Sequence, residues 1–439
     1  MKLSLAMIVK NEAHVLGKCL DSAKDLVDEL VVVDTGSTDK TVEVALSYGA
    51  RVEQFAWTGS FAEARNKSLS LCKCDWILVL DADEILDTAE HQIIRQAIFN
   101  AEAMGYRLWI KNYLDNGSVF GPDGAAKLND GAFEPAAHCS HYIPQTGLRL
   151  FRAQNTPQYA GRIHESVEQW FEKQGYEAPL LEAAIHHFGK VETPDDLARR
   201  RTYLDLARQE AKDYPYDPNS YYNVLKEALI LEDWPAVLES AETYLKLKGD
   251  APLLVRLGGA KALIVLGRPN EALEFIGPVD NEAAPAPAVL ELKAEAFQTL
   301  GMLQEAVDAC LHSINIDPNY TAPFIQLYRI LDDEGEIESA RRILEVGLDQ
   351  NTRDVRLWES LVGLSSKYRD SRAIQDAWHA IQAVPNGGQG IWHMIVAVVL
   401  NGQGSVKEAL DVLDMGLTAF PDNTEIAEMK TKVMKTPAR

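Results

Sequence analysis

The sequence is poor in cysteine, in cations and in long apolar runs, and each shortage excludes a class of protein. Its 439 residues contain five cysteines, whose spacing gives neither a disulfide framework nor a four-ligand zinc site. No apolar stretch approaches the ~20 residues that a membrane-spanning helix needs. Lys and Arg number 43 against 65 Asp and Glu, a formal net charge of −22. Because a phosphate backbone is bound by a basic face, this charge argues against nucleic acid as a partner.

The remaining composition is that of a globular protein with more than one domain. Apolar residues make up 46% and charged residues 25% of the sequence, and the chain is too long for one ordinary core. The first nine residues resemble a signal peptide, but Lys10 and Glu12 follow where a small-residue cleavage site should lie. The segment therefore predicts a first strand, and the expected location is cytoplasmic.

Residues 1 to about 115 alternate between strand and helix patterns. Helical patterns at 12–28 and 38–48 separate short apolar runs at 3–9, 30–33, 52–55, 76–80 and 106–110. This alternation predicts an α/β sheet with right-handed crossovers. Residues 115–145 show no periodicity, so we expect a long loop there that shapes an acceptor site.

From about residue 195 onward the sequence predicts helices only, with an internal repeat. Glycines and alanines recur at a spacing of 34, at Gly267, Gly301 and Gly335 and at Ala272, Ala306 and Ala340. A helix–turn–helix repeat of this length is typical of tetratricopeptide repeats, which commonly bind peptides on a concave face. We expect a catalytic domain at 1–190, a helical linker at 191–218 and five to six repeats at 219–439. The alternative is that the repeats only stabilise the protein or form a homodimer.

An acidic cluster follows the most apolar of the predicted strands. The run from Trp76 to Leu80 ends in Asp81, Asp83 and Glu84. Ligands of α/β sheets bind at the carboxyl ends of strands, and a divalent cation bound to phosphates needs only one or two carboxylates. The cluster therefore suits a nucleotide diphosphate with its metal, although an isolated cluster of this kind is also found as a solvated turn.

Polar residues also follow the first two predicted strands and lie in the next predicted helix. Lys10-Asn-Glu12 and Asp34-Thr-Gly-Ser-Thr-Asp39 would lie at the same edge of the sheet as Asp81. A carboxylate there can accept hydrogen bonds from a ribose or a base, and Gly36 lets the backbone approach a ligand. Arg65 can bind a diphosphate through two nitrogens, although a surface salt bridge is the alternative.

Four motifs in this order resemble family 2 glycosyltransferases: Val9-Lys-Asn-Glu12, Asp34-Thr-Gly-Ser-Thr-Asp39, Phe61-Ala-Glu-Ala-Arg-Asn66 and Asp81-Ala-Asp-Glu84. The likeness is greatest to the branch with tetratricopeptide repeats, near peptide S-glycosyltransferases of bacteriocins and sugar transferases of the lipopolysaccharide core. The motifs cover residues 1–85 well and 147–190 more loosely.

The resemblance implies a GT-A (Rossmann-like) fold, a nucleotide-diphosphate sugar such as UDP-glucose, Mn²⁺ or Mg²⁺, and inversion at the anomeric carbon. It places Asp34 at the base, Glu12 near the base or ribose, Asp81 near the ribose and metal, and Arg65 near the diphosphate. Asp83 would be the principal metal ligand, joined by His186 or His187, for which core packing is the alternative. The implied donor-binding set is Val9, Asn11, Glu12, Asp34, Gly36, Arg65, Asp81 and Ala82.

An inverting displacement also needs a general base on the acceptor side of the sugar. The sequence lacks the Glu-Asp and QxxRW-type motifs of many family members, and Glu165, in Tyr159-Ala-Gly-Arg-Ile-His-Glu165, resembles a His-Glu element of this branch. A salt bridge from Glu165 to Arg162 or Arg149 is the alternative. A cysteine acceptor would need the base less, because a thiolate is already partly available near neutral pH.

The sequence thus predicts an inverting glycosyltransferase whose repeats present a peptide or protein acceptor. Two alternatives stay open: a transferase with a saccharide or lipid-linked acceptor, and a repeat-based adaptor with an inactive catalytic domain. A nucleotidyltransferase fits less well, because no glycine-rich phosphate loop follows the first strand.

Overall fold

The computed structural model describes residues 1–100, 102–114, 120–121, 124–137, 139–155, 157–188, 194–277, 287–384 and 387–435. The chain forms two compact units. The first unit contains Met1–Tyr113, Gly121–Asp123 and Pro144–Ile276, and the second contains Leu114–Phe120, Gly124–Ile143 and Gly277–Arg439. The predicted boundary at 190–191 lies outside the described residues. The helices that follow it, as far as Ile276, belong to the first unit, so the predicted linker and the start of the predicted repeats are part of the same compact body as the sheet.

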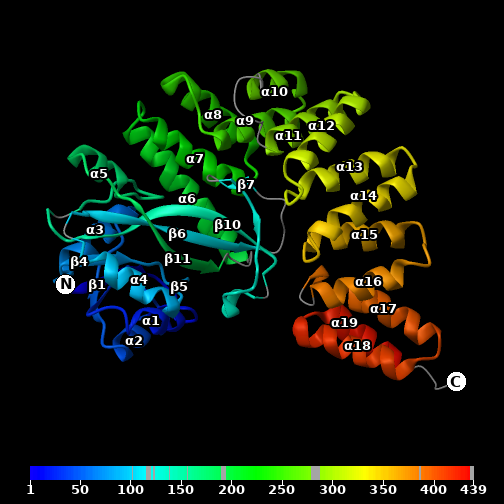
Figure 1. Ribbon diagram of the computed structural model, residues 1–439, viewed down its shortest axis with the longest axis horizontal. Coiled ribbons are helices and arrows are strands. Elements are labelled where there is room, and N and C mark those ends of the chain that lie inside the picture. The colour runs from blue at the N-terminus through cyan, green and yellow to red at the C-terminus, as the bar shows by residue number, and fades with distance from the viewer. Residues whose placement is uncertain are drawn as a thin grey trace. The chain divides into compact units, whose positions relative to one another are not determined.

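A mixed sheet forms the centre of the first unit (Figure 1). Its strand order is β3-β2-β1-β4-β10-β6-β11-β5. The strands are β1 (Leu3–Val9), β2 (Glu29–Asp34), β3 (Arg51–Gln54), β4 (Trp76–Val79), β5 (Glu84–Leu86), β6 (Gly105–Leu114), β10 (His141–Arg152) and β11 (Leu180–Phe188). The first four are parallel, as the alternation of strand and helix predicted.

Parallel pairing brings the polar ends of β1, β2 and β4 to one edge of the sheet. Val9 is paired with Asp34, and Ala6 with Val79, two residues before Asp81. Every residue of β4 is buried, which explains its continuous apolar run. Helices α1 (Leu16–Ala23), α2 (Thr41–Ser47), α3 (Phe61–Leu71), α4 (His91–Ala97) and α5 (Glu168–Gln174) complete the predicted α/β arrangement.

Five helices continue the first unit after the sheet. They are α6 (Pro194–Asp213), α7 (Pro218–Ile230), α8 (Trp234–Lys248), α9 (Leu253–Val265) and α10 (Pro269–Ile276). Asp217 begins α7 as its N-cap by accepting a hydrogen bond from the Asn219 amide, and Pro218 occupies the first turn. Ion pairs of Arg162 with Asp213 and of His164 with Glu227 connect α6 and α7 to the segment between β10 and α5.

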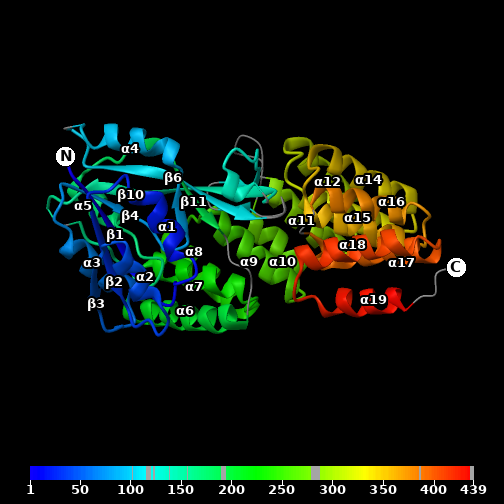
Figure 2. The same ribbon diagram turned by 90° about the horizontal axis from the view of Figure 1, so that it is seen from below.

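The second unit contains the helical repeats that the 34-residue spacing predicted. Its helices are α11 (Pro287–Thr299), α12 (Leu303–Ile316), α13 (Ala322–Asp333), α14 (Ile337–Gln350), α15 (Val355–Lys367), α16 (Ala373–Ala383), α17 (Ile391–Gly402), α18 (Val406–Ala419) and α19 (Thr424–Met434). They follow one another as stacked pairs (Figure 2). Gly301 and Gly335 have φ of +75° and +80° at the turns within pairs, and Ala306 and Ala340 are fully buried. The glycines therefore make the turns, and the small alanines allow close packing of the paired helices.

The prediction of an irregular loop at 115–145 is wrong for part of the described chain. Short strands lie at β7 (Phe120–Gly121), β8 (Gly124–Ala125) and β9 (Lys127–Leu128), and β10 already begins at His141. Strands of two residues are too short to show an alternating pattern in the sequence, which explains the error. Residues 115–119, 122–123 and 138 of the predicted loop lie outside the described residues.

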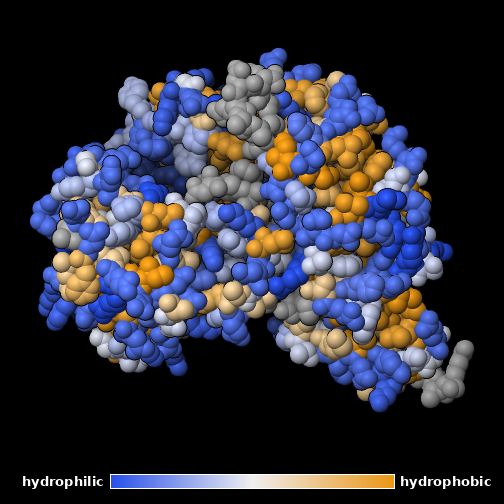
Figure 3. All heavy atoms as spheres, viewed as in Figure 1, coloured by the Kyte–Doolittle hydropathy of each residue, from blue (hydrophilic) through white to orange (hydrophobic). Residues whose placement is uncertain are grey.

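The face seen in Figure 3 is largely hydrophilic, with hydrophobic patches among its side chains. None of the described helices combines the length and the apolar character that a bilayer crossing requires.

Candidate functional site

A cavity of about 1100 Å³ lies in the first unit at the carboxyl ends of β1 and β4. Most of the predicted site residues line it, namely Val9, Asn11, Glu12, Arg65, Asp81, Ala82, Asp83, Glu165 and His187. Asp34, Gly36 and His186 are not among its lining residues. The cavity therefore brings together residues that are distant in the sequence. Val9 and His187, which both line it, are 178 positions apart.

Asp34 is the last residue of β2 and is not among the residues that line the cavity. It is buried, and its carboxylate accepts hydrogen bonds from the amides of Gly36 and Ser37, at 3.2 and 3.1 Å. Gly36 has φ of +108°, a conformation that favours glycine. Thr35, the next residue, lines the cavity, and the contact of Asp34 with a base stays a prediction.

Two guanidinium groups, of buried Arg65 and partly buried Arg149, hold the acids that follow β4. Arg65 Nη2 lies 2.7 Å from Asp81 Oδ1. Arg149 binds Glu84 through two nitrogens, at 2.8 and 3.2 Å, and its Nη2 lies 3.6 Å from Asp81 Oδ2. Although burial opposes the shift, Arg65 and Arg149 hold the pKa of Asp81 well below its usual range. Asp81 is therefore a permanent anion at the edge of the cavity.

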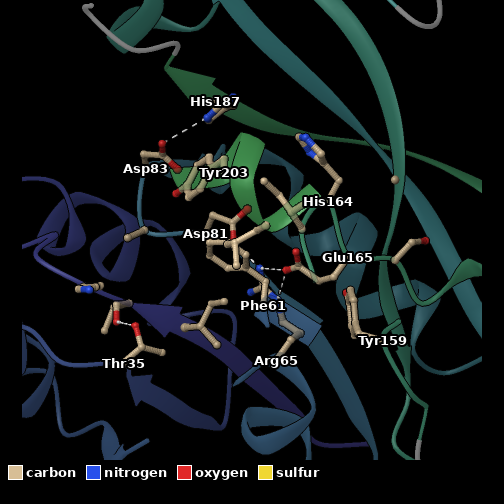
Figure 4. A pocket seen from close by; sticks show the side chains of 18 of the residues that line it. Thr35, Phe61, Arg65, Asp81, Asp83, Tyr159, His164, Glu165, His187 and Tyr203 are labelled. Carbon is tan, nitrogen blue, oxygen red and sulfur yellow. Dashed lines mark hydrogen bonds and ion pairs between the residues drawn. The ribbon is translucent and has the colours of Figure 1, made fainter. Parts of the chain in front are cut away.

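Glu165 lies on the other side of Arg65. Its Oε1 accepts hydrogen bonds from Arg65 Nη2 and Nε at 3.1 and 3.3 Å (Figure 4). The salt bridges considered for it from the sequence are absent among the described residues, since Arg162 pairs with Asp213 and Arg149 with Glu84. Burial raises the pKa of the Glu165 carboxyl, against the attraction of Arg65. A raised pKa is what a carboxylate needs to accept a proton near neutral pH.

Asp83 and His187 point toward one another across the cavity (Figure 4). His187 Nε2 lies 3.3 Å from Asp83 Oδ2, and its other nitrogen, Nδ1, is 2.7 Å from Asn112 Oδ1. Burial opposes the charged form, but the bond with Asp83 raises the pKa of His187. The contact with Asn112 fixes the ring so that Nε2 faces the site, as partners of metal-binding histidines commonly do.

Asp83 and His187 fit a metal ion that takes most of its ligands from a bound nucleotide and from water. The described residues contain no group of three or more His, Cys, Asp or Glu side chains arranged around a common point. Mg²⁺ and Mn²⁺ bound to a nucleotide need few protein ligands, because phosphates and water fill the other positions. A carboxylate and an imidazole nitrogen thus match such a site.

His186 lies on the opposite face of β11 from His187, because side chains alternate along a strand. It is buried, its Nδ1 is 2.7 Å from the Tyr113 hydroxyl, and the two rings are stacked with centroids 5.8 Å apart. Burial lowers the pKa of His186 to about 4. Of the two predicted histidines, only His187 is therefore near Asp83.

Several residues of the cavity wall escaped the sequence-based prediction. Trp57, Phe61 and Tyr203 form an aromatic group in the wall. The ring centroids of Trp57 and Phe61 are 4.8 Å apart, and those of Phe61 and Tyr203 are 5.5 Å apart. Tyr203 belongs to α6, as do the lining residues Arg199 and Arg200, and Lys226 belongs to α7. These helices were assigned to a linker and to the first repeat, and no local motif marks them. Phe61 and His164 do lie within motifs that the sequence showed, so their place in those motifs could have identified them as site residues.

Comparisons with known proteins point to a glycosyltransferase domain in the N-terminal part of the chain. Residues 4–103 match the model of glycosyl transferase family 2. A TPR repeat-containing protein of Synechococcus elongatus is 44% identical over 105 residues, which cover 24% of this chain and 26% of that protein. An uncharacterised glycosyltransferase of Rickettsia bellii is 47% identical over 90 residues, 19% of this chain and 29% of that protein. The glycosyltransferase SunS of Bacillus subtilis is 22% identical over 247 residues, 56% of this chain and 52% of SunS. The chain thus spans about half or less of the length of these relatives.

Solved structures show looser similarity. Staphylococcus aureus TarS, residues 1–349, has a TM-score of 0.34 and 15% identity, over 68% of this chain and 92% of that one. A tetratricopeptide repeat protein of Parabacteroides merdae has a TM-score of 0.35 and 13% identity, over 55% and 94%. Both TM-scores are too low to assign a function. The assignment of the first unit rests on the family match and on the fold itself. Residues 4–103 therefore match a glycosyl transferase family 2 domain within the Rossmann-like mixed sheet of the first unit, and tetratricopeptide-like helices follow along the chain.

Proposed function

We propose that the chain transfers a hexose with inversion from a nucleotide-diphosphate donor, of the UDP-sugar type, in a reaction that requires Mn²⁺ or Mg²⁺. The observation that carries the proposal is one cavity holding both the Asp83–His187 pair and the chain of contacts from Asp81 through Arg65 to Glu165. A cation-binding pair and a candidate base in the same cavity are what a displacement at a sugar carbon needs.

Each group has a role in this reaction. Asp83 and His187 are the residues that would hold the divalent ion, which when bound would stabilise charge on the leaving diphosphate as a Lewis acid. Arg65 brings a fixed positive charge next to Asp81 and Glu165. The attacking oxygen, sulfur or nitrogen of the acceptor bonds to the anomeric carbon of the sugar, while the bond from that carbon to the diphosphate breaks. Glu165 accepts the proton that the attacking atom loses.

We further propose that the acceptor is a peptide or protein side chain, bound by the helices of the second unit. Stacked helical repeats provide extended surfaces that suit such partners. A saccharide or lipid-linked acceptor keeps the same donor chemistry, and an inactive adaptor would keep only the helical surface.

The first experiment measures nucleotide diphosphate release from a panel of nucleotide sugars, with Mn²⁺, Mg²⁺ or a chelator. We expect slow hydrolysis of one donor, lost with the chelator and reduced at least about 100-fold in Asp83→Asn. Asp25→Asn is the matched control, because it removes the same charge from an exposed position outside the cavity. An equal loss in both variants would reject the role of Asp83, and no turnover and no binding of any donor would reject the transferase and leave the adaptor.

With the donor known, transfer to cysteine-, serine- and asparagine-containing peptides is compared by mass spectrometry with transfer to oligosaccharides. A hexose mass shift on a peptide supports the proposed acceptor class. Label found only in saccharide would establish the alternative.

A further inference from the structure

A tight loop carries Glu165 between β10 and α5. The amides and carbonyls of Ala160 and Ser166 exchange two hydrogen bonds of 3.0 Å, which close the loop from Gly161 to Glu165. Gly161 has φ of +107° and His164 has φ of +51°. A left-handed backbone is unfavourable for histidine and persists only where neighbouring contacts enforce it. The contacts that hold His164 therefore decide where the next residue, Glu165, points.

Helices α6 and α7 supply these contacts. The Arg162 amide donates to Glu210 Oε1 at 3.2 Å, and the Arg162 side chain binds Asp213 at 2.8 Å. Asn223 Nδ2 donates to the carbonyl of Ile163 at 3.3 Å. Three successive residues of the loop, from Arg162 to His164, thus have a partner on α6 or α7.

Glu227 on α7 is the partner of His164. Its Oε1 lies 2.9 Å from His164 Nε2 and 3.3 Å from Arg200 Nη1, and its side chain is fully buried. Both His164 and Arg200 line the cavity, whereas Glu227 is not among the lining residues. A buried carboxylate is costly unless its partners satisfy it. Glu227 therefore ties two groups of the cavity wall to one point on α7.

We propose that Glu227 is a positioning residue for Glu165: its carboxylate fixes His164 in the left-handed conformation and thereby directs Glu165 toward Arg65 in the cavity. This inference rests on the proposed function, because it takes Glu165 as the general base of the transfer. It makes α6 and α7 part of the catalytic apparatus rather than a linker and a first repeat.

The test compares Glu227→Ala and Glu227→Gln in the full chain. Glu227→Ala leaves His164 without its partner, and we expect kcat to fall about 100-fold, because misplacing a reacting group by about 1 Å has such an effect. The KM for the donor should change less than about threefold. Glu227→Gln keeps an oxygen that accepts from His164, so its kcat should recover to within about tenfold of the original chain.

Asp376→Asn is the matched control for a purely structural effect. Asp376 is also a buried acid bonded to an arginine, Arg341, at 2.7 and 2.8 Å, but it lies in the second unit. We expect Asp376→Asn to lower thermal stability and to leave kcat unchanged. A parallel loss of kcat in all three variants, following stability, would overturn the proposal.

His164→Gly tests whether Glu227 acts through His164, because glycine adopts the left-handed conformation without support. In that background, Glu227→Ala should change kcat less than about threefold. An undiminished 100-fold effect would show that Glu227 acts by another route.

Hydrogen–deuterium exchange of residues 160–166 gives a readout that needs no activity. The exchange rate should rise in Glu227→Ala and not in Asp376→Asn; an unchanged rate would overturn the proposal even if kcat falls. If the original chain turns over no donor, the proposed function fails, while loop exchange still decides the positioning role. If Glu227→Ala does not fold, His164→Ala replaces it, because it removes the same contact from the other side: kcat should again fall about 100-fold and the exchange rate of residues 160–166 should rise, and an unchanged exchange rate would overturn the proposal.

Discussion

Arg65 and Lys226 are both cations in the wall of the cavity, but their surroundings differ. Arg65 lies between the carboxylates of Asp81 and Glu165, which raise its pKa against the effect of burial. Lys226 packs on the ring of Tyr222, with its Nζ 5.0 Å from the centroid. Burial lowers the pKa of Lys226 to about 8, against the attraction of nearby carboxylates. Arg65 is thus a fixed positive charge in the cavity wall, whereas the charge of Lys226 depends on pH.

Lys226 should make the free energy of unfolding depend on pH. Its pKa in the folded chain is below the value of about 10.4 expected in the unfolded chain, so the unfolded chain binds the proton more tightly. Stability should therefore rise as the pH increases from about 8 toward 10. We expect Lys226→Met, which keeps the apolar stem, to remove this rise. Urea unfolding at pH 7 and 9.5 measures it: the original chain should gain stability relative to the variant, and an equal difference at both pH values would contradict the prediction.

The sequence predicted the residues of the cavity that belong to motifs but not those that the fold brings in. Asp81 and Arg65 lie within the first 85 residues, where short spacings mark the family. Arg200 and Lys226 lie in stretches typical of ordinary helix surfaces, and only the folding of α6 and α7 into the same compact unit as the sheet brings them to the cavity. Which of two adjacent histidines faces the site depends on the register of β11, which the sequence left open.

The alternation of side chains along β11 predicts different roles for two adjacent residues. His187→Ala removes a nitrogen beside Asp83, so we expect the Mn²⁺ concentration for half-maximal donor turnover to rise at least about tenfold. His186→Ala removes the contact with Tyr113 on the other face, and should lower stability by about 1–3 kcal/mol without changing the metal requirement. Metal titrations and thermal unfolding of both variants check this, and the reverse assignment of effects would show that the strand register is wrong.

The repeat glycines offer a test of turn geometry without changes in packing. A Cβ at Gly301 would meet no heavy atom within 4 Å, but its φ is +75°. We expect Gly301→Ala to destabilise the chain by about 1–2 kcal/mol, from backbone conformation alone. Gly363, in the middle of α15, has equally open space and a helical backbone, so Gly363→Ala should stabilise it by about 0.5–1 kcal/mol. Chemical denaturation measures both; effects of the same sign would contradict the argument.

For the whole chain, the sequence predicted the two architectures in the right order, while the predicted domain bounds stay a prediction. The change from strand to helix patterns near residue 195 is real, yet α6 to α10 belong to the first unit. A change in secondary structure marks a boundary only where few contacts cross it. Contacts such as Arg162–Asp213 and His164–Glu227 join the sheet region to α6 and α7, and no periodic pattern in the sequence can indicate them.

Truncation separates the two possible ends of the catalytic unit. A chain of residues 1–276 keeps α6 and α7, with Arg200, Lys226 and Glu227, and we expect it to hydrolyse the donor within about tenfold of the full chain. A chain of residues 1–190 loses that wall of the cavity and the partner of His164, so its turnover should be undetectable even where the sheet folds. Donor hydrolysis and nucleotide-dependent thermal shifts of the two fragments provide the measurement. Activity in 1–190 would place the complete site within the sheet and its own helices, whereas loss in 1–276 as well would mean that the second unit is also required for turnover.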